Sequence, residues 1–282
     1  MLLIQNLPGW ALGLIGKTFS NTDSAAYFQD VVKKTIAKRT EADNHRQDMV
    51  QLMIQSRDKN DNNDGKGLKE TEVTANAITF LAAGFDTSKN TSALFLFSMA
   101  KNPEIQEKVY QELKAKLGNI PAEELTYDDY MELTYLEAAI QESLRFFSID
   151  VRGFRHATAD DVTVPNTDVK IPKGTLINIP FYVVHFDERN FEEPQKFKPE
   201  RYLEKDNIKP CTWLPFGAGP KFCIGQRFAM LQLKVTLTNV LRNYRIENSP
   251  KTPKEFINKV GYFMTEPSDV PVRLVKRNNI NT

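Results

Sequence analysis

A glycine-rich loop that ends in a single cysteine constrains this 282-residue chain more than any other feature. Residues 215–225 read Pro-Phe-Gly-Ala-Gly-Pro-Lys-Phe-Cys-Ile-Gly, which places Cys223 between glycines. Apolar residues at helical spacing follow from Phe228 to Leu241, so we expect a helix directly behind the loop. A thiol at the start of a helix meets unpaired backbone N–H groups and the positive end of the helix dipole. Both effects favour a thiolate at Cys223.

Four interpretations of Cys223 compete. A buried structural cysteine is the most frequent fate of a lone cysteine. A nucleophile would need a histidine partner, and all three histidines lie far from Cys223 in the sequence. A zinc site would need more ligands than Cys211 and Cys223 supply. The fourth interpretation is a thiolate that binds haem iron, because Phe216 and Phe222 supply apolar walls and the loop glycines let the backbone approach a flat group.

The composition allows one large domain and excludes several classes of protein. A chain of 282 residues is long enough to bury a sizeable core. Its 37 basic and 36 acidic residues nearly balance, so nothing indicates a nucleic-acid-binding protein. Two cysteines provide no disulfide framework, which is typical of a reducing compartment. No apolar run reaches the roughly 20 residues that a membrane-spanning helix needs.

A long helix expected at 69–101 has an unusual centre, Ala-Ala-Gly-Phe-Asp-Thr at 82–87. Glycine in the middle of a helix costs roughly 1 kcal/mol relative to alanine. The pattern therefore indicates a buried stretch in which space is needed. Close helix packing at Ala83 and Gly84, with Thr87 bonding to its own backbone, is the alternative explanation.

A second helix, expected at 136–147, carries Glu142 and Arg145. Residues three apart lie on one face of a helix, and the apolar neighbours on this helix indicate that the pair is buried. Exposed pairs of this kind contribute little to stability. A buried pair, in contrast, needs further partners to be tolerated.

The cysteine loop follows the pattern Phe-x-x-Gly-x-Lys-x-Cys-x-Gly, which closely resembles the haem-binding signature of the cytochrome P-450 family, the haem-thiolate monooxygenases. Lys221 stands where the family usually has arginine, so it would pair with a haem propionate as a point charge rather than as a fork. Three further motifs follow the family's order: Asp86-Thr87, Glu-x-x-Arg at 142–145 and Pro-Glu-Arg-Tyr at 199–202. Together they extend the resemblance over most of the chain.

The resemblance implies a mainly α fold with small β-sheets (α+β), namely the C-terminal portion of the cytochrome P-450 fold. The family's N-terminal half would be missing, so the chain looks like a fragment or truncated product of an animal microsomal-type member. A single domain over 1–282 would comprise an entrance or membrane-proximal loop at 1–20, a long oxygen-groove helix at 69–101, the Glu-x-x-Arg helix at 136–147, a meander at 187–215, a Cys-ligand loop at 216–225 and a proximal helix at 224–242.

The resemblance also implies roles for individual residues. Asp86 and Thr87 would be catalytic and relay protons, and Cys223 would bind the iron of haem b. The implied cofactor-binding residues are Ala83, Gly84, Arg155, Phe216, Gly217, Lys221, Cys223 and Gly225. A structural triad behind the haem is implied for Glu142, Arg145 and Arg201. The implied substrate pocket contains Ala82, Ile149, Val151 and Phe263.

Three residues have plainer alternatives. The alternative for Arg155 is an exposed arginine on a strand. His185, in the turn after an expected strand at 176–182, either reaches a propionate or caps its loop. Phe263 is either a wall of the substrate pocket or an ordinary core residue.

The implied activity is insertion of one oxygen atom of O2 into small hydrophobic substrates, with electrons from NADPH through a flavoprotein reductase. We expect the reductase to dock on a basic face that contains Lys221, Arg227, Lys234 and Arg242. The family expectation for location is the cytoplasmic face of the endoplasmic reticulum membrane. The alternative function belongs to a different functional class. In it, the chain is a non-catalytic remnant or an interaction protein without a competent haem site. A cysteine-dependent hydrolase is a third possibility.

Overall fold

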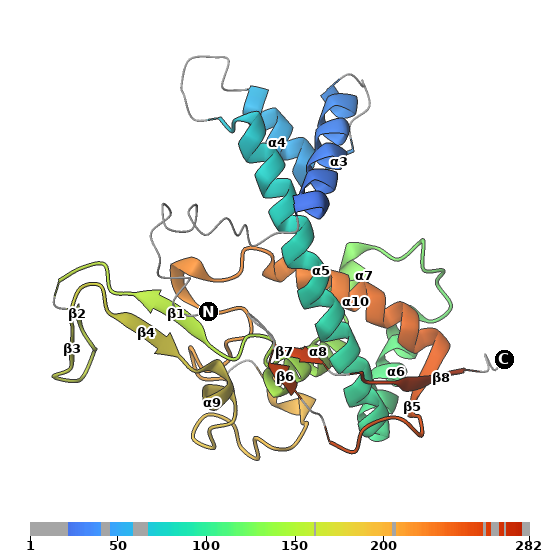
Figure 1. The fold of residues 1–282 in the computed structure, drawn as a ribbon. Helices are drawn as coiled ribbons and strands as arrows, with labels where there is room; N and C mark the ends of the chain where they lie inside the picture. The colour runs from blue at the N-terminus through green and yellow to red at the C-terminus, as the bar shows by residue number, and fades with distance from the viewer. Residues whose placement is uncertain are drawn as a thin grey trace. The chain divides into compact units, whose positions relative to one another are not determined.

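The chain divides into two compact units, residues 1–85 and 86–282, which are described separately (Figure 1). The computed structural model describes residues 22–40, 46–58, 67–160, 162–204, 207–255, 258–260, 265–267 and 269–277. The predicted loop at 1–20 and the predicted pocket residue Phe263 lie outside these ranges.

The first unit contains helices α3 (Thr22–Thr40) and α4 (Met49–Asp58) and the first half of α5 (Glu70–Lys101). Its small core contains Ile36, Met53, Ile54, Val73 and Ala77. Arg39 binds Asp48 with two hydrogen bonds, of 2.5 and 2.9 Å. These bonds lower the pKa of Asp48 to about 2, so the residue before α4 is a stable carboxylate.

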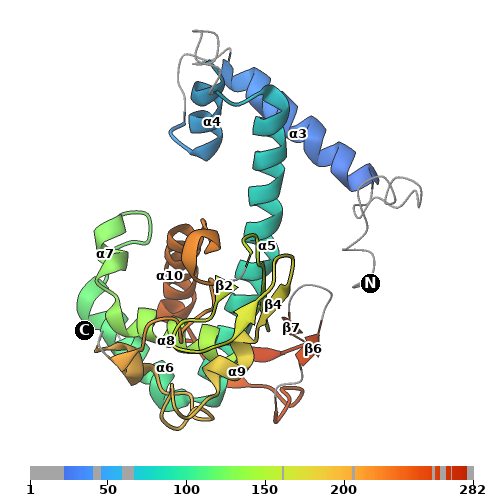
Figure 2. The same cartoon turned by 90° about the vertical axis from the view of Figure 1, so that its left-hand side faces the viewer.

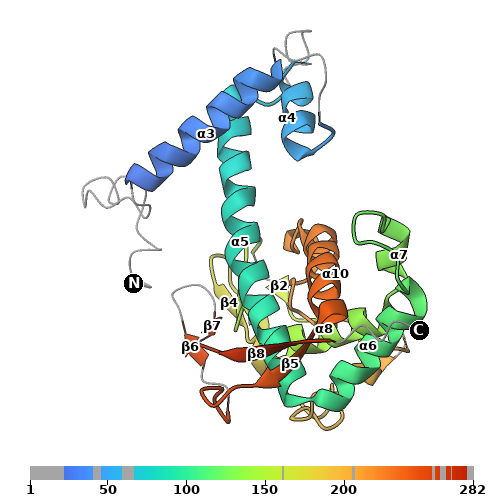
Figure 3. The ribbon, with the colours of Figure 1, turned by 90° about the vertical axis from the view of Figure 1, so that its right-hand side faces the viewer.

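The second unit holds the larger core, formed mainly by α6 (Pro103–Leu117), α8 (Thr134–Phe146) and α10 (Gln226–Asn243). Figure 3 shows these three helices next to one another. The core residues that these helices share are apolar and lie at helical spacing, among them Val109, Leu136, Ile140, Leu237 and Leu241. Shorter helical segments complete the unit: α7 (Tyr127–Met131), α9 (Phe181–His185), η2 (Pro199–Tyr202) and η4 (Gly219–Lys221).

Helix α8 begins on a carboxylate that belongs to another helix. Its N-cap residue, Leu133, makes no side-chain cap bond. Instead, Glu112 of α6 accepts hydrogen bonds from the backbone N–H groups of Tyr135 and Leu136, at 2.8 and 2.9 Å. A carboxylate at this position satisfies unpaired donors and interacts favourably with the helix dipole.

The strands that the structure describes form four two-stranded antiparallel ladders. They are β1 (Gly153–His156) with β4 (Leu176–Ile179), β2 (Val162–Thr163) with β3 (Lys170–Ile171), β5 (Tyr244–Asn248) with β8 (Val272–Lys276), and β6 (Asn258–Val260) with β7 (Thr265–Pro267). Figure 2 shows the β1–β4 ladder next to α9. The chain is thus mainly helical with small sheets, which confirms the predicted fold class.

A side-chain amide completes the hydrogen bonding of β5. Gln106 of α6 is buried, and its Nε2 donates to the carbonyls of Met99 and Ile246, each at 2.9 Å. Its Oε1 accepts from the backbone N–H of Ile246 at 2.8 Å. The amide therefore pairs with both backbone groups of Ile246, as a neighbouring strand would.

The helix bounds differ slightly from those expected from sequence. The helix that carries Glu-x-x-Arg was expected at 136–147 and spans Thr134–Phe146. The helix behind the cysteine loop was expected at 224–242 and starts at Gln226, because the N–H of Gln226 bonds to the carbonyl of Cys223 and Gly225 is the N-cap. The cysteine loop therefore includes the two residues after the cysteine.

We expect Gly153→Ala to lower the free energy of unfolding by about 1–3 kcal/mol, the usual cost of overpacking. A Cβ at position 153 would lie 2.5 Å from Cζ of Phe181, a buried ring. Urea unfolding would measure the loss. Gly84→Ala is the matched control, since a Cβ there meets nothing within 4 Å and the helix should gain about 1 kcal/mol. Equal stability of Gly153→Ala and the parent chain would contradict the prediction.

Candidate functional site

The loop that carries Cys223 is closed by its own backbone. The N–H of Cys223 donates to the carbonyl of Phe216 at 2.8 Å, and the N–H of Gly217 donates to the carbonyl of Leu214 at 3.0 Å. The loop therefore turns back on itself and leads into α10. The Cys223 side chain is exposed, which argues against the interpretation as a buried structural cysteine.

Two of the loop glycines are required by the backbone. Gly217 and Gly219 have φ values of +69° and +76°, where a residue with a Cβ is strained. Gly225 carries no such requirement, because a Cβ there would lie at an ordinary contact distance of 3.9 Å from Sγ of Cys223. The tight turn thus depends on the first two glycines.

Large apolar side chains frame the thiol. Phe222, Ile224 and Phe228 are 55%, 84% and 70% exposed. Phe216 is half-buried, and its ring centroid lies 6.0 Å from that of Trp213. Large apolar side chains exposed next to a free thiol are unfavourable in water and mark a surface that binds an apolar partner.

Two cations border the same loop. Nη2 of Arg155, on β1, donates to the carbonyl of Ala218 at 3.2 Å. Lys221, on η4, is exposed. Arg155 is half-buried and bonded to the loop, so the alternative of a free, exposed strand arginine does not describe it. The structure brings Arg155, Phe216, Gly217, Lys221, Cys223 and Gly225 together around one loop.

A buried histidine holds the start of this loop. His185 Nε2 accepts the N–H of Leu214 at 2.8 Å, so the neutral ring carries its proton on Nδ1. That proton points at Oγ of Ser148, 2.6 Å away, and Oγ lies 3.3 Å from the carbonyl of Arg145. Burial, and secondly the charge of Arg145, lower the pKa of His185 to about 4. His185 is thus a neutral brace for the loop, and of its two predicted roles the geometry favours capping.

Glu142 neutralises two arginines in the core of the second unit. Nε and Nη2 of Arg145 donate to the two carboxylate oxygens of Glu142, each at 2.8 Å. Nε of Arg201 donates to Oε1 at 3.2 Å, and the backbone N–H of Lys198 donates to the same atom at 2.8 Å. The side chains of Glu142 and Arg145 are fully buried. The structure therefore brings the three residues of the predicted triad together.

The acid–threonine stretch of α5 is more exposed than expected. Asp86 pairs with Lys89 at 2.6 Å, and both side chains are more than half exposed. Thr87 is half-buried. The expectation that the whole stretch is buried is wrong, because Ala82 and Ala83, in the first unit, are also exposed. The Asp86–Lys89 ion pair lies on a face of α5 that is exposed to water.

A hydrogen bond links α5 to the helix behind the cysteine loop. Oγ of Ser88 donates to Oε1 of Gln232 on α10 at 3.3 Å. Ser88 directly follows Thr87, and α10 begins three residues after Cys223. Within the second unit, two motifs that are far apart in sequence are therefore joined.

Two of the predicted substrate-pocket residues, Ile149 and Val151, lie in the described part of the second unit. Ile149 is buried in a small core cluster with Leu94, Phe97 and Phe147. It is therefore a packing residue of the second unit here, rather than an open pocket wall. Val151 is half-buried. Ala82 belongs to the first unit and is described there alone.

Lys234 is the clearest correction to the predicted basic face. Its side chain is only 1% exposed, and Nζ donates to Glu137 at 2.6 Å and to the carbonyl of Tyr130 at 3.1 Å. A buried, paired lysine cannot steer a partner in solution. Arg242 also has backbone partners, the carbonyls of Gly118 and Ile120.

A family model described as cytochrome P450 matches residues 1–272 of this chain. The chain belongs to the cytochrome P450 family. This P450 chain is 36% identical to cytochrome P450 3A31 of Mesocricetus auratus over 233 residues, which cover 82% of this chain and 45% of that protein. It is 37% identical to cytochrome P450 3A7 of Homo sapiens over 214 residues, or 75% and 42% of the two chains. The chain thus spans less than half the length of these curated relatives.

The cysteine loop of this P450 chain fits a haem group. Haem offers a flat apolar ring and two carboxylates, and the loop offers an exposed thiol, exposed apolar side chains and two cations, Arg155 and Lys221. In a thiolate site the protein supplies a sulfur ligand to the iron. The described residues hold no group of three or more His, Cys, Asp or Glu side chains that could bind a metal ion by themselves.

Sequence reasoning missed polar residues that join the elements of the second unit. Glu112, Gln106 and Lys234 all bond to elements far from them in sequence. The available signal was a polar residue at a position that helical spacing assigns to the apolar face, as for Gln106 and Lys234. The sequence did not identify their partners.

Proposed function

We propose that this chain forms the haem-thiolate part of a monooxygenase that inserts one oxygen atom of O2 into small hydrophobic substrates. The observation that carries the proposal is the exposed thiol of Cys223, held by a closed glycine loop and framed by exposed apolar side chains. The glycine geometry and the cations at the loop edge support haem b as the cofactor.

Each residue of the loop has a task in this proposal. Cys223 would supply the sulfur ligand to the iron, and Arg155 and Lys221 would bind the haem carboxylates. Phe222 and Ile224 would cover apolar ring surface and exclude water. Haem with a thiolate ligand supplies the activation of dioxygen, for which the electron donation from sulfur is needed.

The acid–threonine pair would handle protons. Asp86 holds or releases a proton at its carboxylate, and Thr87 passes it on through its hydroxyl. The bond from Ser88 to Gln232 supports this proposal, since it ties this part of α5 to the helix behind Cys223. The roles of Ala83 and Gly84 in admitting dioxygen belong to the same proposal.

The proposed partners follow from the family. A small hydrophobic substrate, O2 and an NADPH-dependent flavoprotein reductase are the partners, and no nucleic acid is involved. Arg227 and Lys221 are exposed and remain the proposed reductase contacts, whereas Lys234 is not among them. The proposed location of the full-length protein is the cytoplasmic face of the endoplasmic reticulum membrane. Among the helices that the structure describes, none is both long and apolar enough to span a bilayer.

The reduced carbon monoxide difference spectrum of the haem-supplied chain tests the proposal. We expect the parent chain to show the band of a thiolate-ligated haem and Cys223→Ser to lose it completely, because the serine hydroxyl cannot replace the sulfur donor. Cys211→Ser is the matched control, since Cys211 is also an exposed, free cysteine and should leave the band unchanged.

The outcomes separate the proposal from its alternative. A parent chain that folds but gives no such band would favour a non-catalytic remnant or interaction protein. Reducing the same sample with NADPH and a flavoprotein reductase, instead of dithionite, tests the proposed electron donor. A band that Cys223→Ser retains would overturn the assignment of the ligand.

A further inference from the structure

A buried serine follows the helix that carries the Glu-x-x-Arg motif. Ser148 is the second residue after α8 and is 3% exposed, and its neighbour His185 is 0% exposed. Oγ of Ser148 lies 2.6 Å from Nδ1 of His185 and 3.3 Å from the carbonyl of Arg145. Neither side chain reaches solvent, so the pair does not act on a substrate as a serine–histidine nucleophile would. Its effect is on the residues around it.

The hydrogen bonds around His185 admit one arrangement of protons. A serine hydroxyl has one proton to donate and two lone pairs that accept. The carbonyl of Arg145 only accepts, so it takes the hydroxyl proton of Ser148, and Oγ then accepts the proton of Nδ1. On the other side of the ring, the N–H of Leu214 only donates, so Nε2 of His185 is the acceptor. The two sides of the neutral ring therefore require the same tautomer.

This tautomer holds the backbone that leads into the cysteine loop. Leu214 is buried, and its N–H donates to Nε2 of His185 at 2.8 Å. The carbonyl of Leu214 accepts the N–H of Gly217 at 3.0 Å. Two residues further on, the carbonyl of Phe216 accepts the N–H of Cys223 at 2.8 Å. A short series of hydrogen bonds thus connects the imidazole ring to the residue that carries the thiol.

The rest of His185 is fixed, which leaves the ring proton as the variable that Ser148 controls. Nη1 of Arg145 donates to the carbonyl of His185 at 2.9 Å. The imidazole lies edge-on to the ring of Phe191, with centroids 6.3 Å apart. A ring held by its backbone in a close-packed core is not free to turn. The position of the proton therefore decides whether Nε2 accepts from Leu214.

We propose that Ser148 is a positioning residue for Cys223 and acts through the tautomer of His185. Its hydroxyl keeps the ring proton on Nδ1, so that Nε2 stays an acceptor for the N–H of Leu214. Without this hydroxyl, the buried Nδ1 proton would lose its acceptor, and the other tautomer would place a second donor against the N–H of Leu214. The cysteine loop would then open at its start. The consequence for sulfur ligation rests on the proposed function, whereas the hold on the loop does not.

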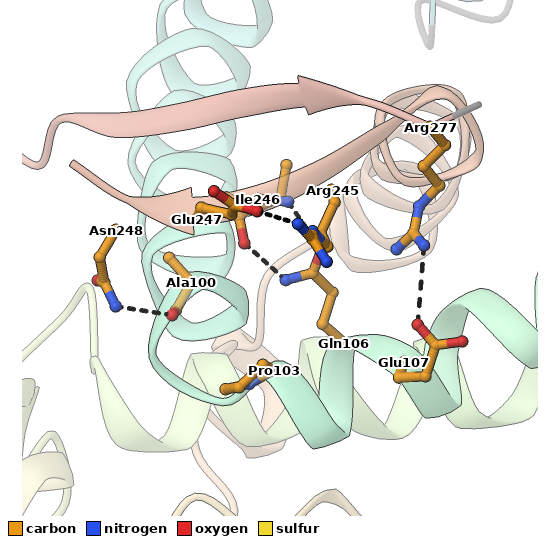
Figure 4. A pocket seen from close by; sticks show the side chains of 9 residues that line it. All are labelled: Ala100, Pro103, Gln106, Glu107, Arg245, Ile246, Glu247, Asn248 and Arg277. Carbon is orange, nitrogen blue, oxygen red and sulfur yellow. Dashed lines mark hydrogen bonds and ion pairs between the residues drawn. The ribbon is translucent and has the colours of Figure 1, made fainter.

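Hydrogen exchange of the backbone amides, measured by NMR on the full 282-residue chain without added haem, tests the hold on the loop. We expect Ser148→Ala to speed the exchange of the Leu214 amide by about tenfold or more, the usual effect of leaving a buried donor unpaired. The Ile246 amide is the internal reference and should be unchanged. It donates to the buried side chain of Gln106 at 2.8 Å, in the wall of a pocket that shares no lining residue with the cysteine loop (Figure 4).

Ser143→Ala is the matched control. Ser143 lies on α8 and is 1% exposed, and its Oγ has no hydrogen-bond partner among the described residues. The substitution therefore removes an equally buried hydroxyl that holds nothing, and it should leave the exchange of the Leu214 amide unchanged. Ser148→Thr keeps a hydroxyl at the same position and should restore slow exchange. Nitrogen-15 shifts of the His185 ring should place its proton on Nδ1 in the parent chain.

The reduced carbon monoxide difference spectrum extends the test to the haem-supplied chain. Ser148→Ala should lower the thiolate-ligated fraction several-fold, whereas Ser143→Ala and Ser148→Thr should retain it. Faster exchange of the Leu214 amide in Ser148→Ala, with a parent chain that shows no thiolate band, would refute the proposed function and support the hold on the loop. A thiolate band in the parent that Ser148→Ala retains, with slow exchange, would refute the positioning role alone.

Two further results would overturn the proposal. Equal acceleration of the Leu214 and Ile246 amides in Ser148→Ala would show general loosening of the unit instead of a local effect on the loop. A ring proton on Nε2 of His185 in the parent chain would contradict the tautomer. This second measurement needs no substitution, so it decides the question even if Ser148→Ala does not fold.

Discussion

Glu142→Gln should lower the free energy of unfolding by about 3–5 kcal/mol, the usual cost of removing one partner from a buried ion pair. Glutamine has almost the same shape, so packing on α8 stays intact. The change removes the only negative charge that the described contacts place against the guanidinium groups of Arg145 and Arg201. Both side chains are at least nine-tenths buried and cannot turn to water. A loss of this size is a large part of a typical domain's stability.

Urea unfolding followed by the fluorescence of Trp213 would measure the loss. Trp213 reports locally, because its Nε1 donates to the carbonyl of Gln141, next to the substituted residue. Asp86→Asn is the control, since it breaks an ion pair of the same i,i+3 spacing with Lys89 whose side chains are more than half exposed. It should cost less than about 1 kcal/mol. If Glu142→Gln and Asp86→Asn lost similar amounts of unfolding free energy, the burial of Glu142 would not add to the cost of removing its charge, which would contradict the prediction.

Acidification from about pH 7 to pH 4 should destabilise the chain through His185 by about 3 kcal/mol. The folded pKa of His185 is about 4, below its ordinary value of 6.5. The unfolded chain therefore takes up a proton at a higher pH than the folded chain. Stability from this residue is fully present above pH 6.5 and is lost as pH falls towards 4. The structural reason is that a proton on Nε2 would face the N–H of Leu214 and break their hydrogen bond.

The free energy of unfolding at several pH values, for the parent chain and His185→Gln, measures this effect. Glutamine does not titrate, and its oxygen can still accept the N–H of Leu214, so the variant should lose about 3 kcal/mol less than the parent over this range. His156→Gln, at an exposed position on β1, is the control for replacing a histidine by glutamine. Parallel curves for the parent and His185→Gln would contradict the prediction.

The sequence predicted those features that depend on spacing along one element. Glu142 and Arg145 lie three residues apart among apolar neighbours, and this alone indicates a buried pair. The glycines around Cys223 indicate a tight turn, and Gly217 and Gly219 do adopt the conformation that only glycine takes readily. The fold class and the family followed from such local patterns, and both are confirmed.

The sequence did not predict features that depend on which distant elements meet. Lys234 is basic and was assigned to an exposed face, but α10 packs so that its ammonium group reaches Glu137. Ile149 was assigned to a pocket and lies in a core cluster. His185 ends the short helix α9, and only the packed structure reveals that its two ring nitrogens bridge Ser148 and Leu214. Long-range partners are set by tertiary packing, which periodicity does not encode.

The carboxylate of Glu112 at the start of α8 has a consequence for how this unit folds. Two of the first free amides of α8 obtain their acceptor only when α6 is already in place. The same helix carries, closer to its C-terminal end, Glu142, the acid that compensates two buried cations. Formation of α8 and docking of α6 are therefore coupled, and the two helices should open and close as one foldon.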